Sequence, residues 1–291
     1  MEQKLKITND LVFQRMFGKP GNENITKGFL EKILGIQIES LTLDTNKRLI
    51  GNVVENKIGR VDVKAKLNDG IKVIIEMQVA PYKAMTRRFL YYWAETYVGD
   101  LKKGEPYEKL DKTIGILISV ESIEETKNIE EYHTKWTIRE EENLSEKLTN
   151  DLEMHIIELS KFKEGQNKPE ENWIKFINGG EIEDMVINDK YLEEAKKELK
   201  YLCSDPVLRE EYDERIRDLR DIVTVMEDKF QEGMEKGIEK GMERGREEGI
   251  NKNKKDVILN MSKNKMKIED ICIAVDMQKE EVEEIIKNSS K

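Results

Sequence analysis

The sequence is poor in the residues that mark disulfide-rich, zinc-binding or membrane-spanning proteins. Its 291 residues include 2 cysteines, Cys203 and Cys272, which match no metal-binding spacing. No stretch approaches the roughly 20 apolar residues of a membrane-spanning helix. The first 25 residues hold no long apolar run, which argues against a secretory signal peptide. We therefore expect a cytoplasmic chain with reduced thiols and no membrane partner.

Histidines and several well-known catalytic motifs are also scarce. The 2 histidines, His133 and His155, stand apart in the sequence without clustered partners, so we expect each to be structural. The sequence contains neither a Gly-rich phosphate loop nor a G-x-S-x-G motif. NTPase and serine-hydrolase functions therefore lack support.

Charge is abundant and unevenly distributed. Charged residues make up 38% of the chain, and the net charge is −10. Residues 1–120 nevertheless carry a net charge of +5, and residues 121–291 carry a net charge of −15. Because a local basic region matters more for nucleic-acid binding than the total, DNA remains a candidate partner of the first part.

Hydrophobic periodicity and turn residues predict alternating helices and strands in the first part of the chain. Helices are expected after the N-cap candidates Thr8, Asn9 and Asp10, over residues 25–34 and after Pro81. Strands are expected within residues 38–45, 59–79, 113–120 and 154–162. This order favours an α/β or α+β core that ends near residue 165, followed by a helical region.

The stretch "GRVDVKAKLNDGIKVIIEMQV", residues 59–79, predicts a β-hairpin with unusual polar residues. If a three-residue turn ends at Gly70, Leu67 pairs with Ile71, and Asp62 lies opposite Glu76. Side chains alternate along a strand, so these two carboxylates then share one face, while the apolar residues line the other. The same arithmetic places Arg60 opposite Gln78 on the carboxylate face.

Two interpretations of the facing carboxylates follow from spacing alone. Like charges directly opposed in a sheet are destabilising, and a divalent cation such as Mg²⁺ would neutralise them. Alternatively, Asp62 and Glu76 are exposed on a solvated face. A two-residue turn, Asp69–Gly70, would place the carboxylates diagonally and weaken the metal interpretation.

The hairpin resembles a known nuclease signature. An acidic residue on one strand, followed by a strand with (D/E)-x-K, is the motif of PD-(D/E)XK phosphodiesterases. "GRVDVKAK" and "VIIEMQV" are similar to the variant in the Rpn family of recombination-promoting nucleases and putative transposases, in which Gln replaces the Lys. The segments "ITNDLVFQRMFG", "GFLEKILG", "RRFLYYWAETY" and "ENWIKFI" also resemble that family, as does the Gly-periodic tail, so the similarity covers nearly the whole chain.

The resemblance implies a restriction-endonuclease-like fold, a mixed sheet flanked by helices, and a Mg²⁺-dependent DNA endonuclease. Asp62 and Glu76 would bind Mg²⁺ or another divalent cation, with the Met77 carbonyl, and Gln78 would orient the attacking water or contact the phosphate. An amide cannot supply the charge of the usual Lys. Arg60 is one candidate for that charge, or for an ion pair with Glu76. Arg87 and Arg88 on the following helix are candidates for binding DNA phosphates.

The alternative function is a non-catalytic DNA-binding or oligomerising protein that keeps the nuclease fold. The expected parts are a nuclease core over residues 1–165, a helical extension over residues 166–230 and a Gly-periodic helical tail over residues 231–291. The tail ends in two short helices around a turn near Asp276, the outline of a helix-turn-helix.

The tail contains an internal repeat, "EGMEKGIEKGMERGREEGI". Glycine recurs at every fourth position, and each costs about 1 kcal/mol relative to Ala inside a helix. A close helix–helix contact in a homodimer would explain the repeat, and a flexible charged linker is the other explanation. Both remain open from the sequence.

Overall fold

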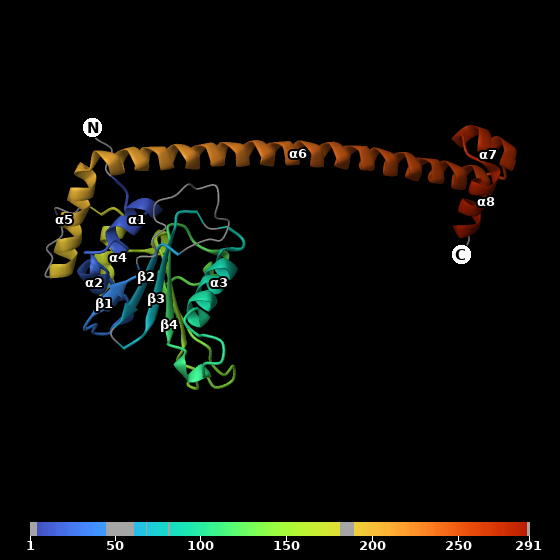
Figure 1. The fold of residues 1–291 in the computed structure, drawn as a ribbon. Coiled ribbons are helices and arrows are strands. Elements are labelled where there is room, and N and C mark those ends of the chain that lie inside the picture. Colours follow the sequence, from blue (N-terminus) through green and yellow to red (C-terminus); the bar gives the residue numbers. More distant parts are fainter. Residues whose placement is uncertain (1–4, 45–60, 68, 81, 181–188, 290–291) are drawn as a thin grey trace. The chain divides into compact units, whose positions relative to one another are not determined.

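The structure is a computed structural model that describes residues 5–44, 61–67, 69–80, 82–180 and 189–289. Its internal contacts divide the chain into two compact units, Met1–Glu214 and Arg215–Lys291. The first unit holds a sheet with helices on both faces, and the second is helical (Figure 1). No described helix is both long and apolar enough to cross a membrane.

A mixed sheet forms the centre of the first unit. In the described residues its strands are β1 (Leu41–Leu43), β2 (Val63–Leu67), β3 (Lys72–Gln78), β4 (Thr113–Ser119), β5 (His133–Trp136) and β6 (Leu152–Glu158). Their order is β1-β2-β3-β4-β6-β5; the central pairs β3/β4 and β4/β6 are parallel, and the outer pairs are antiparallel. This arrangement confirms the expected α/β fold. Strand β5 was not predicted, because its segment is charged and half-exposed.

One face of the sheet is covered by helix α3 (Met85–Val98). Its buried residues Met85, Phe89 and Tyr92 form a core cluster with Ile74 of β3 and with residues of β4 and β6. The expected helix after Pro81 is therefore confirmed. Leu90 lies on its outer side and is 43% exposed. Both faces of β3 are consequently buried, as a central parallel strand requires.

The opposite face is covered by α1 (Asp10–Phe17) and α2 (Glu23–Leu34), with α4 (Glu171–Ile177) and α5 (Lys190–Ser204) packed beside them (Figure 1). Asn9 is the N-cap of α1, since its side chain accepts a hydrogen bond from the Leu11 N–H, and Asp10 is the first helical residue. The fully buried Trp173 of α4 packs against the rings of Phe17 and Phe29. Short 3₁₀ helices span Tyr107–Lys109, Glu124–Thr126 and Leu159–Lys161.

The hairpin has the register expected from the turn arithmetic. Val63 pairs with Ile75, and the Leu67 N–H donates to the Ile71 carbonyl oxygen. Gly70 has a φ of +87°, which glycine adopts without strain. Asn68, the first expected turn residue, lies outside the described residues. Continuing the register by one residue places Asp62 beside Glu76.

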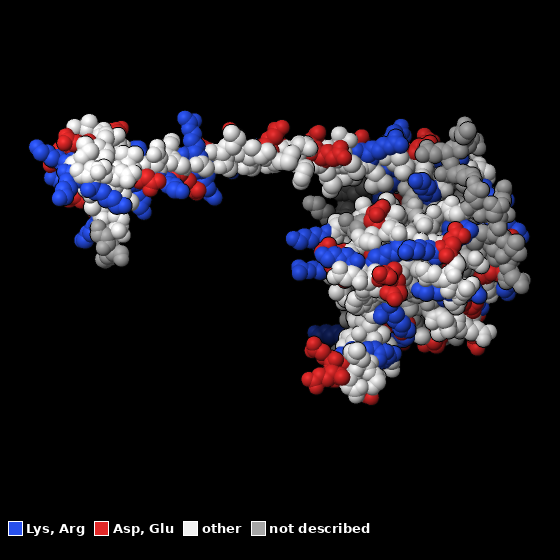
Figure 2. All heavy atoms as spheres, turned by 180° about the vertical axis from the view of Figure 1, so that it is seen from behind, with Lys and Arg blue, Asp and Glu red and all other residues white. Residues whose placement is uncertain are grey.

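The second unit contains most of α6 (Pro206–Lys263), a single 58-residue helix, and ends in α7 (Ile268–Val275) and α8 (Lys279–Asn288). The two predicted terminal helices are confirmed, and Asp276 between them has a left-handed φ of +50°. Ile258, Ile271, Val275 and Val282 form their small core. On the face seen in Figure 2, basic and acidic side chains are interspersed over these helices, without the uniform positive charge of a strong DNA-binding helix pair.

Candidate active site at the open end of the hairpin

Asp62 lies directly before β2, where the hairpin opens. Its half-buried side chain accepts two hydrogen bonds of 2.7 Å. One comes from the backbone N–H of Met77 on β3, and the other comes from the side-chain amide of Gln14 on α1. These two bonds fix the carboxylate against β3 and connect it to the helix on the opposite face of the sheet.

Glu76 lies near the C-terminal end of β3 and is only 5% exposed. Its Oε1 accepts a 2.6 Å hydrogen bond from Nη2 of Arg88 on α3. Its Oε2 is buried without a hydrogen-bond partner. Burying a carboxylate oxygen without a partner costs free energy, so a hydrogen-bond donor or a cation bound to this atom would stabilise it.

Burial raises the pKa of both carboxyl groups, since removal from water disfavours the charged form. The pKa of Asp62 rises from 3.8 to about 6, although the hydrogen bonds from Met77 and Gln14 oppose the rise. The pKa of Glu76 rises from 4.5 to about 8; the charge of Asp62 adds to the effect of burial, and Arg88 opposes both. The protein by itself therefore disfavours two ionised carboxylates here.

The backbone of Met77 faces the same opening. The N–H of Lys72 and the carbonyl of Gln78 bond to residues beside β4, so the even-numbered backbone groups of β3 face that strand. Backbone groups alternate along a strand, and those of Met77 therefore face β2, as its bond to Asp62 shows. The Met77 carbonyl thus lies on the side of β3 that carries Asp62.

These groups fit a hard divalent cation. Mg²⁺ takes oxygen ligands, uses one or two carboxylates, and keeps several positions for water or phosphate. Asp62, Glu76 and the Met77 carbonyl offer that donor set, and the buried Glu76 Oε2 lacks any other partner. No cluster of three or more His, Cys, Asp or Glu side chains suited to a metal occurs in the part of the chain that the structure describes. The candidate donor set consists of these two carboxylates and one backbone carbonyl.

The other predicted site residues are divided between the site and the surface. Gln78 accepts a 3.3 Å hydrogen bond from Arg88 and donates one of 2.7 Å to the carbonyl of Ala80. Arg88 therefore lies inside the site, in contact with both Glu76 and Gln78, whereas its neighbour Arg87 is exposed. Arg60 lies outside the described residues.

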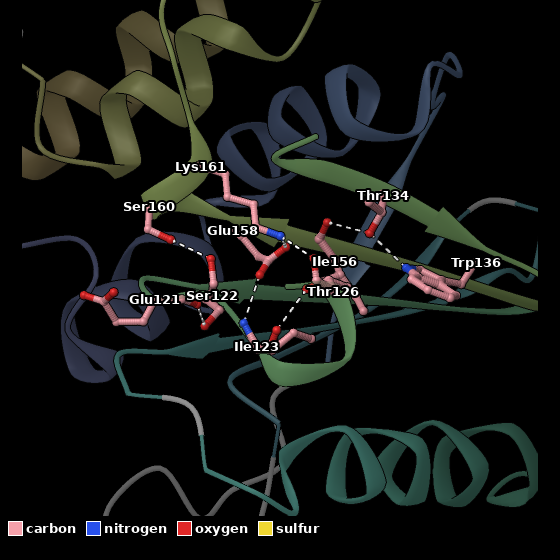
Figure 3. A network of polar contacts seen from close by, with 11 residues as sticks. Glu121, Ser122, Ile123, Thr126, Thr134, Trp136, Ile156, Glu158, Ser160 and Lys161 are labelled. Atoms are coloured by element: carbon pink, nitrogen blue, oxygen red, sulfur yellow. Dashed lines mark hydrogen bonds and ion pairs between the residues drawn. The ribbon is translucent and has the colours of Figure 1, made fainter. Parts of the chain in front are cut away.

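Glu158 gives an internal comparison for Glu76. It lies on the same sheet face at the end of β6, in line with Ser119 and Gln78 on the neighbouring strands. Its two oxygens accept hydrogen bonds from the Ile123 N–H at 2.9 Å and from Lys161 at 2.6 Å (Figure 3). The protein itself thus satisfies both oxygens of this buried carboxylate and only one of Glu76.

The two histidines form a second polar cluster, which corrects the prediction that they lack partners. Nε2 of His133 and Nδ1 of His155 lie 2.8 Å apart, and the outer ring nitrogens contact Glu170 at 2.9 Å and Glu153 at 3.0 Å. Burial lowers the pKa of His155, which favours its neutral form. With every ring nitrogen engaged within the protein, the cluster stabilises the junction of β5, β6 and α4.

A family comparison covers most of the chain. The model of the PD-(D/E)XK nuclease family transposases matches residues 7–229. The chain belongs to this family. No curated protein and no solved structure gives a significant match. The match includes the hairpin with Asp62, Glu76 and Gln78.

Sequence reasoning missed the contacts that two residues, Gln14 and Arg88, make at this candidate site. Gln14 was overlooked because it lies 48 positions before Asp62, on a helix whose apolar pattern drew attention to its other face. Arg88 was assigned to DNA phosphates, and its bonds to Glu76 and Gln78 were not expected. The only signal for these bonds in the sequence was that Arg88 follows "VIIEMQ" closely, on the next helix along the chain, which packs against β3.

Proposed function

We propose that this protein is a Mg²⁺-dependent DNA endonuclease of the recombination-promoting nuclease/transposase type. The observation that carries the proposal is the buried, partnerless Oε2 of Glu76 beside the second carboxylate, Asp62. Family membership supports phosphodiester hydrolysis as the chemistry. The proposed location of this activity is the cytoplasm.

Each residue has a distinct proposed role. Asp62 and Glu76 hold the cation together with the Met77 carbonyl, and Gln14 keeps the Asp62 carboxylate oriented. A divalent cation held there would polarise a phosphoryl oxygen and activate a water molecule as the nucleophile. Gln78, at the end of β3, would orient the attacking water through its amide.

DNA is the proposed substrate. The positive balance of residues 1–120 attracts the phosphate backbone. Arg87 is exposed on α3, one residue from the arginine inside the site, so it is placed to contact a neighbouring phosphate. The proposed parts remain the nuclease core over residues 1–165, the helical extension over residues 166–230 and the tail over residues 231–291.

The tail is proposed to form a homodimer. Gly233, Gly237, Gly241, Gly245 and Gly249 of α6 have open space where a Cβ would lie, and the neighbouring apolar side chains Met234, Ile238, Met242 and Ile250 are exposed. With 100° per residue, the three repeats over residues 233–244 place small, apolar, acidic and basic side chains in four stripes around the helix. The acidic and basic stripes flank the small–apolar seam on opposite sides.

This charge arrangement distinguishes the two ways of pairing the helices. In a parallel two-stranded pair, opposite flanks of the seam face each other, so Glu would meet Lys or Arg. In an antiparallel pair the same flanks meet, and like charges would repel. The repeat therefore favours a parallel, twofold-symmetric dimer through residues 233–250.

Plasmid nicking tests the nuclease function. Purified protein should convert supercoiled plasmid to nicked or linear DNA with Mg²⁺ and lose this activity with EDTA. The variant Asp62→Asn, which keeps the shape of the side chain but removes its charge, should be slower by orders of magnitude, because metal activation contributes several kcal/mol and each 1.36 kcal/mol is about tenfold in rate. A folded Asp62→Asn protein that cuts as fast as the wild type would rule out this mechanism. A wild type that binds DNA without cutting it would instead favour the non-catalytic alternative.

A further inference from the structure

We propose that Arg88 of α3 supplies the positive charge that position 78 lacks, and that its guanidinium binds the scissile phosphate. This inference rests on the proposed function, because it assigns a role within the same nuclease site. An amide at position 78 has no charge at any ordinary pH. The described residue nearest to it with a permanent positive charge is Arg88, whose Nη2 lies 3.3 Å from Gln78 Oε1.

The contacts of Arg88 place its charge at the end of β3. The same Nη2 that reaches Gln78 lies 2.6 Å from Glu76 Oε1, so one nitrogen contacts both side chains of the motif. Glu76 and Gln78 are two residues apart on one strand and share a face. The guanidinium therefore lies over the place where a longer cationic side chain at position 78 would put its charge.

Arg88 also has the freedom that a phosphate ligand needs. Its side chain is 37% exposed, in contrast to the 7% of Glu76. Its guanidinium carbon lies 5.2 Å from the ring centre of Tyr82 and 5.5 Å from that of Tyr92. The two aromatic rings hold the planar group by cation–π attraction while leaving its other N–H donors available for the bidentate pairing that phosphates favour.

The ion pair between Arg88 and Glu76 gives Arg88 different roles in the metal-free and the metal-bound site. Without metal, Arg88 partly neutralises the charge of Glu76 through their 2.6 Å contact. A divalent cation on Glu76 would take over that neutralisation and repel the guanidinium. Arg88 would turn from the carboxylate toward the phosphate, and one residue would serve the empty and the loaded site in turn.

A double-mutant cycle tests this assignment, because two residues that supply the same charge must show strong coupling. The variants are Arg88→Met, Gln78→Lys and the combination of both, compared by Mg²⁺-dependent plasmid cleavage. Arg88→Met should lower kcat by at least about a hundredfold, the size of effect expected for losing a preorganised group at the reacting phosphate. Gln78→Lys should raise cleavage by about tenfold or more in the Arg88→Met background and have a much smaller effect in the wild type.

Two matched controls separate this role from general DNA binding. Arg87→Met removes the exposed neighbouring charge and should raise KM with little change in kcat. Lys103→Met removes an exposed charge beyond the end of α3 and should leave both constants unchanged. If Arg88→Met changed KM alone, as Arg87→Met is expected to, the assignment to the scissile phosphate would be wrong.

Thermal unfolding without metal or DNA gives a second readout. The change in melting temperature caused by Gln78→Lys should be more positive in the Arg88→Met background than in the wild type, since a lysine can pair with Glu76 only when Arg88 is absent. Equal effects of Gln78→Lys in the two backgrounds, for both cleavage and melting temperature, would overturn the inference while leaving the proposed function intact. Absence of Mg²⁺-dependent cleavage by the wild type would overturn both.

Discussion

Replacing Glu76 by Gln should stabilise the metal-free protein at alkaline pH. In the folded protein the pKa of Glu76 is raised from 4.5 to about 8 by burial and by Asp62. A carboxyl group with a raised pKa binds its proton more tightly when folded, so its contribution to stability is lost as pH rises from about 4.5 to about 8. Above that range the folded protein carries the full cost of ionising Glu76. The neutral amide of Gln removes this cost.

The size of the effect follows from the shift. Each pKa unit corresponds to 1.36 kcal/mol, which gives a stabilisation on the order of 4 kcal/mol at pH 8.5 and nearly none at pH 4.5. For a unit of this size, that corresponds to a rise of roughly 10 °C in melting temperature. Arg88 loses its ion pair in the variant, but its half-exposed side chain retains water and Gln78 as partners.

Thermal unfolding of the wild type and Glu76→Gln across this pH range, with EDTA, measures the difference. Glu141→Gln is the matched control, since Glu141 is exposed and the same substitution there should change stability little at any pH. Adding Mg²⁺ at pH 8.5 should stabilise the wild type and leave Glu76→Gln unchanged. A Glu76→Gln protein that is less stable than the wild type at pH 8.5, or whose advantage does not depend on pH, would refute the reasoning.

Three further predictions concern the second carboxylate and the C-terminal region. Asp62→Asn should leave the stability of the metal-free protein unchanged or slightly raised. The substitution removes repulsion from Glu76, and the side-chain amide of Gln14 can rotate to accept a hydrogen bond from Asn. A fall of more than about 2 kcal/mol in the free energy of unfolding would show that the charge of Asp62 itself stabilises the hairpin. Deleting residues 231–291 should leave cooperative unfolding of the remaining protein, measured by circular dichroism, and loss of cooperativity would contradict the proposed boundary. In a protein whose Cys203 and Cys272 are replaced by Ser, the variant Ile238→Cys should form a disulfide-linked dimer on oxidation, because a parallel pair brings identical positions together; a monomer under the same conditions would exclude that dimer.

The parts of the fold with strong local signals were predictable from the sequence. The three-residue turn that ends at Gly70 gave the correct hairpin register, because turn length fixes which residues pair. The helix cap at Asn9, the end of α2 at Leu34 and the buried strand β4 also lie where the pattern placed them. In each case a few neighbouring residues determine the local structure.

Contacts between distant segments were not predictable from these patterns. The orientation of α3, which buries Tyr92 and exposes Leu90, depends on how its side chains fit β3, β4 and β6, and several apolar residues surround that helix. The hydrogen bond from Gln14 to Asp62 and the ion pair of Arg88 with Glu76 arise from that packing. The pairing of His133 with His155 likewise required the antiparallel register of β5 and β6.

The central claim is that Asp62 and Glu76 together bind one divalent cation. Crystals of the protein soaked with Mn²⁺, a Mg²⁺ analogue with an anomalous signal, give the most direct measurement. We predict one anomalous peak within coordination distance of both carboxylates, with the Glu76 Oε2 turned toward it, and no peak there in crystals of Asp62→Asn. A well-ordered wild-type site without a peak, or a peak bound elsewhere with Arg88 still joined to Glu76, would contradict the claim.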